Sequence, residues 1–289
     1  MDQPSLESSL SDLPLSAISF FNSIDSTNDE AWRWVERGAP HPALVIADEQ
    51  TAGRGRFQRR WVTSAGSSLA FSLILHSPPF DPQLLTRFTG LGALAVSQAL
   101  EHDYRLPAQV KWPNDILLGG RKTGGVLVES RWQGQDLIAV VIGVGINIAS
   151  QSISPAILPP PGLNFPATCV EEELGHPVDR MALLHTVLRE FFDWNQKLAS
   201  PEFLRAWENR LAFRGQWVEW VAETSPMPAS PGHAPSQLAT GKVDGLADDG
   251  SLRLIDRSGK SFTVHAGEIR LRLAGTLPMS LRGERSSGT

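Results

Sequence analysis

The sequence predicts an α+β fold, with a mixed, largely antiparallel sheet flanked by helices and a small β-rich domain near the C-terminal end. Three observations support this prediction. Apolar runs typical of strands alternate with helical patterns over the N-terminal part of the chain. Successive apolar runs separated by short turns near the middle indicate an antiparallel meander. Beyond Phe213 the pattern changes to short strands and tight turns, which indicates a small β-barrel.

The composition is that of an ordinary globular protein. The chain has 289 residues, of which 41% are hydrophobic and 20% are charged. Its net charge of -5 argues against a surface that coats nucleic acid, because such binding requires many Lys and Arg to neutralise phosphates. Cys169 is the only cysteine, so no intramolecular disulfide can form. We find no signal-peptide pattern and no apolar run long enough to span a membrane, and therefore expect a cytoplasmic protein.

A capped helix is predicted over residues 25–38, DSTNDEAWRWVERG. Thr27 is expected to be its N-cap, and Glu30, three positions later, is expected to be the capping-box partner. Gly38 is expected to end the helix, because glycine favours this position. Residues 1–18 are expected to form a flexible N-terminal segment.

Two strands are predicted on either side of an arginine-rich loop. The run ALVIAD (43–48) is continuously apolar, as in a buried strand, whereas SLAFSLILH (68–76) alternates like a strand with one core face. The segment between them, TAGRGRFQRRW (51–61), has no strong helix or strand pattern. We therefore expect a loop, held at both ends by the sheet, that carries four arginines: Arg54, Arg56, Arg59 and Arg60.

The predicted meander occupies the middle of the chain. A helical pattern at 82–102 is followed by a strand and a proline turn in QVKWPND (109–115). The stretch ILLGGRKTGGVLVES (116–130) contains two apolar runs that flank a glycine-rich turn carrying Lys122, and DLIAVVIGVGINI (136–148) is a long β-rich run. Three successive runs with short turns predict three antiparallel strands.

Two more helices are predicted at 179–200 and 201–212, after a connection rich in Pro and Ser at 150–166.

These patterns divide the chain into a main domain at 19–212 and a small β-domain at 213–275. A loop rich in Pro, Ser and Ala at 223–240 lies inside the small domain and is expected to be flexible. The polar tail at 276–289 is expected to be disordered.

Several familiar motifs are incomplete. The run GVGINI begins like a dinucleotide-binding fingerprint, but Ile148 stands in place of the third glycine and the run does not open a helix. The tripeptide GKS at 259–261 lacks the first glycine of a P-loop, since Leu254 occupies that position. The seven histidines show no close pairing with Cys or a second His, so no zinc site is predicted. The nucleophile motif G-x-S-x-G is also absent from the sequence.

Five features remain as candidates for chemistry: the DSTN helix start, Gln50 at a strand end, the loop GRGRFQRRW, KWPND, and GRKTGG. Helix-start N–H groups beside the hydroxyls of Ser26 and Thr27 suit a carboxylate or a polar head group, although both hydroxyls could simply cap their helix. The glycines beside Arg54 and Arg56 allow close approach to a ligand, and guanidinium groups bind phosphate and carboxylate. A solvated arginine face is the alternative interpretation of this loop.

Lys122 could be an ordinary hairpin-turn lysine, and Trp112 and Pro113 are predicted to be packing residues. Two arginines and a lysine can nevertheless hold a carboxylate next to the α-phosphate of a nucleotide and stabilise the charge of a pentacoordinate transition state. The product of such a reaction is a mixed acyl-adenylate. The residues therefore favour an enzyme that activates a carboxylate with a nucleotide.

The motifs DSTN, QTAGRGRFQRRW, KWPNDILLGGRKTGGVLVE and IGVGINI occur in the order and at about the spacing found in biotin protein ligases. The sequence resembles this family over residues 20–150, and the stretch from GKVDGLADDGSLRLI to GEIRLR is similar to the family's small SH3-like domain. The resemblance implies a class II synthetase-like fold and a two-step reaction. Biotin and Mg-ATP give biotinyl-5′-adenylate and pyrophosphate, and a lysine amine of a biotin carboxyl carrier protein then takes the biotinyl group.

The resemblance also implies roles for individual residues. Four residues are expected to meet the biotin head group: Ser26, Thr27, Asn28 and Gln50. The loop is expected to fold over biotin and the adenylate phosphate through four residues: Gly53, Arg54, Gly55 and Arg56. Lys122 is expected to contact the biotin carboxylate and the phosphate, and to be catalytic together with Arg54 and Arg56.

On the nucleotide side, the resemblance implies that Trp61 and Asn147 lie near the adenine. Asn114 and Asp115 are expected to help place ATP or its Mg²⁺, and no tightly bound metal is expected. The implied acceptor is the biotin carboxyl carrier protein of acetyl-CoA carboxylase, and a homodimer is compatible with the family.

The sequence departs from the family pattern in two respects. The usual loop is G-R-G-R-x-G-R-x-W, and Gln58 replaces its third glycine. If that position is left-handed, Gln would cost about 1–2 kcal/mol there. Family members that repress transcription carry a helix-turn-helix domain before DSTN, whereas only 24 residues precede Asp25 here, so we expect a ligase that does not bind DNA.

Two other functions remain as alternatives. A lipoate–protein ligase or octanoyltransferase would have the same fold, but GRGRFQRRW followed by KWPND is typical of the biotin ligases. A non-catalytic regulator could bind a nucleotide or nucleic acid through the basic loop, but the acidic net charge argues against it.

Overall fold

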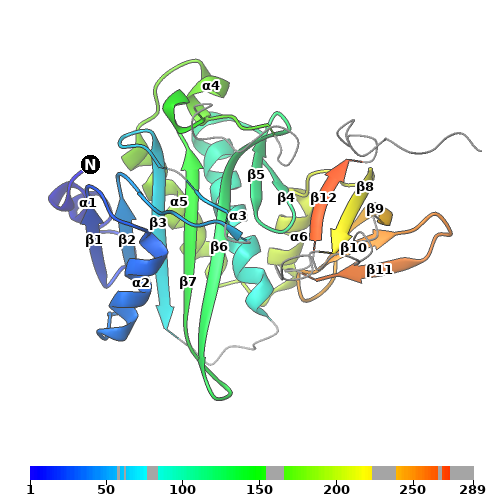
Figure 1. The fold of residues 1–289 in the computed structure, drawn as a ribbon, viewed down its shortest axis with the longest axis horizontal. Helices are drawn as coiled ribbons and strands as arrows, with labels where there is room; N and C mark the ends of the chain where they lie inside the picture. The colour runs from blue at the N-terminus through cyan, green and yellow to red at the C-terminus, as the bar shows by residue number, and fades with distance from the viewer. Residues whose placement is uncertain are drawn as a thin grey trace, which may run out of the picture.

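The computed structural model describes residues 1–56, 59–61, 63–76, 84–153, 166–222, 239–265 and 269–273. These residues form a seven-stranded sheet with helices on both faces and a five-stranded sheet beside it (Figure 1). The predicted α+β class is therefore confirmed. The proposed loop at 223–240 lies outside the described residues except for its last two positions, and Gln58 and the tail at 276–289 also lie outside them.

The large sheet is mixed, in the order β1-β2-β3-β7-β6-β5-β4. Only β1 and β2 pair in parallel, with Ala17 opposite Ala43, and the other neighbours are antiparallel. The predicted meander is confirmed as β5, β6 and β7. The strands are β1 (Ala17–Phe21), β2 (Ala43–Ala47), β3 (Ser68–His76), β4 (Gln109–Lys111), β5 (Asp115–Leu118), β6 (Arg121–Gln133) and β7 (Asp136–Asn147).

Helices cover both faces of the central strands. In Figure 1, α2 (Thr27–Glu36) lies in front of the sheet, and α3 (Leu85–Tyr104) and α5 (Arg180–Asn195) lie behind it. The predicted helices at 25–38, 82–102 and 179–200 are thus confirmed. Shorter helical segments are η3 (Ser150–Ile153), α4 (Val170–Leu174) and α6 (Pro201–Asn209). Among the described helices, none has both the length and the apolar character that crossing a membrane requires.

Strand β3 is buried on both faces, which corrects the expectation of a single core face. Phe71 and Leu73 belong to the main apolar core, whereas Ile74 packs in a smaller cluster that includes Ala31 of α2. Ser72 is also fully buried. Ser72 faces α2 rather than solvent, because its Oγ lies 2.8 Å from Thr27 Oγ1 and 2.6 Å from Asn28 Oδ1, and it forms part of the site described below.

The N-terminal residues are ordered, so the expectation of a flexible segment at 1–18 is wrong. Helix α1 (Gln3–Ser9) and the turn after it bury Leu6 and Leu10, whose spacing of four residues places them on one helix face. The Gln3 side chain bonds the exposed edge of β1, donating to Ile18 O at 2.9 Å and accepting from Phe20 N at 2.9 Å. This contact covers part of an edge strand that would otherwise offer free backbone groups.

The second sheet is antiparallel, in the order β11-β10-β9-β8-β12. Within the described residues no ladder joins β11 to β12, so the sheet is open and the predicted barrel is not confirmed. Its strands are β8 (Trp217–Ala222), β9 (Ala239–Leu246), β10 (Leu252–Ile255), β11 (Ser261–Val264) and β12 (Ile269–Leu273).

Side chains of the main domain hold the second sheet in place. Buried Arg87 of α3 donates to Leu198 O at 2.7 Å and also to Asp248 O. Trp112 Nε1 donates to Gly250 O at 3.0 Å. Gly250 lies in the turn between β9 and β10. Because Trp112 belongs to KWPND, this turn directly supports a segment that the sequence assigns to the site.

Candidate functional site

The site begins at the N-terminus of α2. Ser26 is the N-cap, with Asp29 N donating to Ser26 Oγ at 3.4 Å, so the prediction that Thr27 caps the helix is wrong by one residue. Glu30 is not a capping-box partner, because it accepts from Arg33 and Arg37 further along the helix. Gly38 follows the helix with a φ of +79°, as expected for the residue that ends it.

Thr27 is instead held by Gln50, at the end of the chain segment that follows β2. Thr27 N donates to Gln50 Oε1 at 2.9 Å, and Thr27 Oγ1 donates to the same atom at 3.2 Å. Gln50 Nε2 in turn donates to Thr63 Oγ1 at 3.2 Å. The structure therefore brings together two residues that the sequence assigned to one binding site, and it buries both.

Asn28 lies flat against the large sheet. Its Oδ1 accepts from Ser72 Oγ at 2.6 Å, and its Nδ2 donates to Glu129 Oε2 at 2.8 Å. A Cβ atom at Gly143 would lie 2.2 Å from Asn28 Oδ1. Only glycine at this position of β7 leaves room for the buried Asn28 amide.

Trp61 makes the same kind of contact two residues further along β7. A Cβ atom at Gly145 would lie 2.4 Å from the Trp61 ring. Residues at i and i+2 of a strand share one face, so Gly143 and Gly145 form a flat floor under Asn28 and Trp61. We name this pair the glycine floor.

The arginine-rich loop folds back on itself. The backbones of Arg54 and Arg60 form an isolated antiparallel β-bridge. In addition, Gly55 N donates to Arg59 O at 2.7 Å, and Trp61 N donates to Gly53 O at 2.8 Å. A Cβ atom at Gly53 would lie 2.3 Å from Trp61 O, which explains the glycine there.

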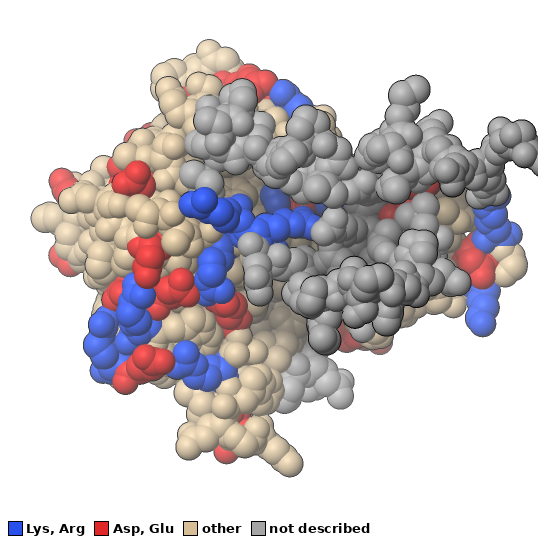
Figure 2. Space-filling view, viewed as in Figure 1, with Lys and Arg blue, Asp and Glu red and all other residues tan. Residues whose placement is uncertain are grey.

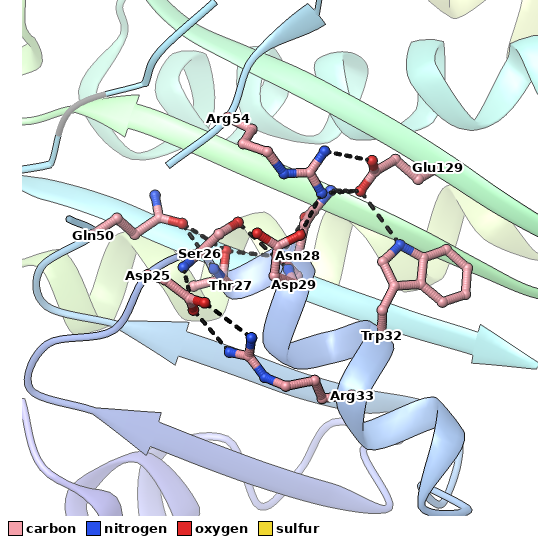
Figure 3. A network of polar contacts seen from close by, with 11 residues as sticks. Asp25, Ser26, Thr27, Asn28, Asp29, Trp32, Arg33, Gln50, Arg54 and Glu129 are labelled. Atoms are coloured by element: carbon pink, nitrogen blue, oxygen red, sulfur yellow. Dashed lines mark hydrogen bonds and ion pairs between the residues drawn. The ribbon is translucent and has the colours of Figure 1, made fainter. Parts of the chain in front are cut away.

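Arg54 lies between two carboxylates (Figure 3). It forms a two-pronged pair with Glu129, through Nη1 to Oε1 at 2.8 Å and Nη2 to Oε2 at 3.0 Å, and Nη2 also donates to Asp29 Oδ1 at 2.6 Å. The hydrogen bonds to Glu129 raise the pKa of Arg54 despite its partial burial. The guanidinium group therefore faces the start of α2, beside the predicted head-group residues.

Arg56 reaches a different part of the site. Its Nη1 donates to Asn114 Oδ1 at 3.2 Å, and Asn114 Nδ2 donates to Val126 O of β6 at 3.1 Å. The loop thus connects the start of α2 with the KWPND segment.

Lys122 lies on β6 rather than in the turn where the sequence placed it. Gly119 and Gly120, with φ of +54° and +75°, form that turn. Lys122 Nζ lies 2.5 Å from Asp115 Oδ1 and 5.8 Å from the centre of the Trp61 ring. Lys122 therefore continues the line from Asn28 through Trp61.

Asp115 holds two lysines at once. Its Oδ1 pairs with Lys122, and its Oδ2 accepts from Lys111 Nζ at 2.9 Å. Burial alone would raise the pKa of Asp115, but the two ammonium groups outweigh burial and hold this pKa well below its usual range. Both carboxylate oxygens are thus engaged, so contact with ATP or Mg²⁺ would require one of these ion pairs to open.

Asn147, at the end of β7, borders the Lys122 side of the site. Asn147 Nδ2 donates to Thr168 O at 3.2 Å. Lys122 is bonded to the same segment, with Lys122 N donating to Pro166 O at 2.7 Å and Thr168 N donating to Lys122 O at 2.9 Å. Residues 166–168 therefore line this side.

These contacts define one continuous strip across the large sheet. At one end are the hydroxyl and amide groups of Thr27, Asn28 and Gln50, in the middle is Trp61 on the glycine floor, and at the other end is the Lys122 ammonium group. Such a strip suits an extended ligand with a neutral polar head and an anionic tail. Figure 2 shows basic and acidic side chains intermixed over α2, in keeping with the ion pairs described above.

The sequence analysis missed five residues of this site: Asp29, Lys111, Glu129, Gly143 and Gly145. The glycines carried a signal, because two glycines alternating along a β-rich run indicate close approach to the strand face. Lys111 is the first residue of the motif KWPND but was given no role, and Asp29 directly follows the motif DSTN. Glu129 is the last residue of the motif KWPNDILLGGRKTGGVLVE, but no role was assigned to it.

Comparison with known proteins agrees with this geometry. The family model described as Biotin/lipoate A/B protein ligase matches residues 20–147. The biotin--[acetyl-CoA-carboxylase] ligase of Paracoccus denitrificans is 34% identical over 250 residues, which cover 85% of this chain and 96% of that protein. The chain belongs to the biotin/lipoate protein ligase family.

Other proteins to which the chain is similar are also ligases by name. The bifunctional ligase/repressor BirA of Bacillus spizizenii is 38% identical over 165 residues, which cover 57% of this chain and 49% of that protein, so the chain spans about half the length of this relative. The structure of the Aquifex aeolicus biotin protein ligase in complex with biotin and ATP has a TM-score of 0.72 and 28% identity. That match covers 90% of this chain and all of the other.

We expect Gly143→Ala to destabilise the fold. The new methyl group must displace the buried Asn28 amide, and overpacking of this kind costs about 1–3 kcal/mol. Urea unfolding measures the effect. Gly125→Ala on β6 is the control, because a Cβ atom there has its nearest neighbour at 3.5 Å. Equal stability of the two variants would contradict the glycine floor.

We expect Asp115→Asn to lower the free energy of unfolding by about 2 kcal/mol near neutral pH, because it leaves two lysines without their shared partner. The folded-state pKa of Asp115 lies below its ordinary value of 3.8, so the contribution is complete above that pH and is lost as the pH falls further. The difference from wild type should therefore be constant from about pH 5 to 8 and shrink only at lower pH.

Glu172→Gln, which removes one exposed partner of Arg121, is the control for this experiment. It should change stability by less than about 0.5 kcal/mol. An Asp115→Asn variant as stable as this control at neutral pH would contradict the proposed ion-pair arrangement.

Proposed function

We propose that this protein activates biotin with ATP and transfers the biotinyl group to a lysine of a biotin carboxyl carrier protein. The observation that carries the proposal is the continuous strip from the polar groups at the start of α2 to the Lys122 ammonium group. Biotin has the matching shape, with a neutral polar ring system at one end and a carboxylate at the other. The biotin ligases among the relatives support the same substrate.

The head-group end requires groups that are already in place before the ligand arrives. Ser26, Thr27, Asn28 and Gln50 are buried, and their hydrogen bonds fix their rotamers. Preorganised donors and acceptors of this kind give orientation at a low entropic cost. We assign these four residues to the biotin ring system, with Gly53 and Arg54 of the loop beside them.

The anionic end performs the first chemical step. A biotin carboxylate oxygen attacks the α-phosphorus of ATP, the bond from that phosphorus to the bridging oxygen breaks, and pyrophosphate leaves with the electron pair. Lys122 and Arg56 place positive charge where the carboxylate and the phosphate meet, which offsets their repulsion and stabilises the transition state. Gly55 lets the loop backbone approach this point.

The adenine is assigned to the side of the site formed by Trp61 and Asn147. Trp61 Nε1 is buried beside Gly145 and has no hydrogen-bond partner among the described residues. Asn114 is assigned to ATP through its contact with Arg56.

In the second step, the neutral amine of the acceptor lysine attacks the acyl carbon of the adenylate. The bond from that carbon to the phosphate oxygen breaks, AMP leaves with the electron pair, and the nitrogen loses a proton to solvent. The described residues need only exclude water and hold the adenylate during this step, because the mixed anhydride is already activated. The acceptor is proposed to be the biotin carboxyl carrier protein of acetyl-CoA carboxylase.

Mg²⁺ is expected to enter with ATP. Among the described residues, no group of three or more His, Cys, Asp or Glu could hold a metal ion, and Asp115 is engaged by two lysines. Because both Asp115 oxygens are engaged, we assign no protein ligand to the ion.

We propose a cytoplasmic enzyme that does not bind DNA, with residues 213–275 forming an SH3-like domain. A homodimer is compatible with the proposal.

The proposal is tested by ATP-dependent transfer of labelled biotin to a purified carrier domain. Lys122→Ala should slow adenylate formation by about 2–4 kcal/mol in activation free energy, the range for loss of one preorganised charged donor. Lys197→Ala is the matched control, because Lys197 also pairs with a carboxylate and lies over a tryptophan ring, 5.3 Å from its centre. Transfer of lipoate or octanoate in place of biotin would overturn the substrate assignment, and near-normal adenylation by Lys122→Ala would remove Lys122 from the mechanism.

A further inference from the structure

Glu129 is a half-buried carboxylate on β6 to which neither the family motifs nor the mechanism above gives a role. Its two oxygens accept four hydrogen bonds from three residues: Arg54, Asn28 and Trp32 (Figure 3). These donors come from the arginine-rich loop and from α2, which are far from β6 in sequence. Glu129 is therefore the point at which three separate segments of the site meet.

The contacts fix Glu129 from the side of α2. Asn28 Nδ2 donates to Oε2 at 2.8 Å, and Trp32 Nε1 donates to the same oxygen at 3.4 Å. Asn28 is itself fixed by Ser72 and by the glycine floor. The carboxylate thus has one defined orientation before Arg54 is considered.

Arg54 depends on this carboxylate for its own position. The two-pronged pair with Glu129 fixes the plane of the guanidinium group as well as its distance, which a single hydrogen bond cannot do. The neighbouring residues, Gly53 and Gly55, carry no side chains that could restrain Arg54. Asp29 adds only one further contact, to Nη2.

We propose that Glu129 is a positioning residue that acts through Arg54, holding its guanidinium group at the biotin end of the site. This inference rests on the proposed function, because it concerns the affinity for biotin. Glu129 need not touch the substrate itself. Its effect is to keep Arg54 ordered beside Asn28, so that less conformational entropy is lost when biotin binds.

The isosteric substitution Glu129→Gln tests this inference. It removes the negative charge and puts an amide N–H₂ group among donors, so the pair with Arg54 is lost. We expect biotin to bind about tenfold more weakly in calorimetry, the effect of losing one charge-assisted hydrogen bond, with the KM for ATP changed by less than about twofold. A purely structural role would instead lower the melting temperature and affect both substrates alike.

A double-mutant cycle shows whether Glu129 acts through Arg54. In an Arg54→Ala background, Glu129→Gln should change biotin affinity by less than about twofold, because the residue it positions is absent. Glu36→Gln is the matched control, since Glu36 also joins α2 to β6, through Arg131 at 2.7 Å, but lies outside the site. This control should bind biotin like the wild type.

The outcomes separate the two proposals. Failure of the wild type to bind biotin overturns the proposed function and this inference together. If the wild type binds biotin, then an unchanged affinity in Glu129→Gln, or the same loss with and without Arg54, overturns only the role of Glu129.

Discussion

The site depends on one steric constraint, the lack of side chains at Gly143 and Gly145 on the face of β7. Because of it, Asn28 and Trp61 lie directly against the sheet, closer than any other residue type on β7 would allow. Asn28 then reaches Glu129 and Ser72, and Trp61 reaches Lys122. Filling either glycine position would force Asn28 or Trp61 away from the sheet and so disturb the strip that the proposed substrate spans.

Electrostatics adds a second constraint. The protein carries a net charge of -5, yet its site gathers Arg54, Arg56, Lys111 and Lys122. The first is paired with Glu129 and Asp29, and the two lysines share Asp115. These carboxylates hold Arg54 and the two lysines in defined places, which is the preorganisation that charge-stabilising catalysis requires.

Much of the fold could be predicted from the sequence, because strand and helix periodicities are local. The antiparallel meander and the helices at α2, α3 and α5 follow from such patterns. The N-cap could not be assigned in this way, because Ser26 with Asp29 and Thr27 with Glu30 fit the local pattern equally well. In the structure Ser26 is the N-cap, and Thr27 instead contacts Gln50, which is 23 residues away in the sequence. Helix α1 did leave a local signal, the spacing of Leu6 and Leu10, which the sequence analysis overlooked.

The same distinction, between local sequence patterns and contacts of distant residues, applies to the site. Motifs identified the loop, Lys122 and the head-group residues, but the partners that orient them come from distant segments. Glu129 lies 75 residues from Arg54, and no local pattern connects them. Gly143 and Gly145 stood in the incomplete nucleotide fingerprint and in the motif IGVGINI, but their steric role was not predicted. Contacts of this kind depend on tertiary structure, so they could not be predicted from one sequence.

The measurement that tests the central claim most directly is exchange of labelled pyrophosphate into ATP by the purified protein, with biotin, lipoate, octanoate or no acid present. Exchange reports reversible formation of the acyl-adenylate without any carrier protein. We predict exchange with biotin and none with the other additions. Equal exchange with lipoate or octanoate, or no exchange with biotin, would contradict it.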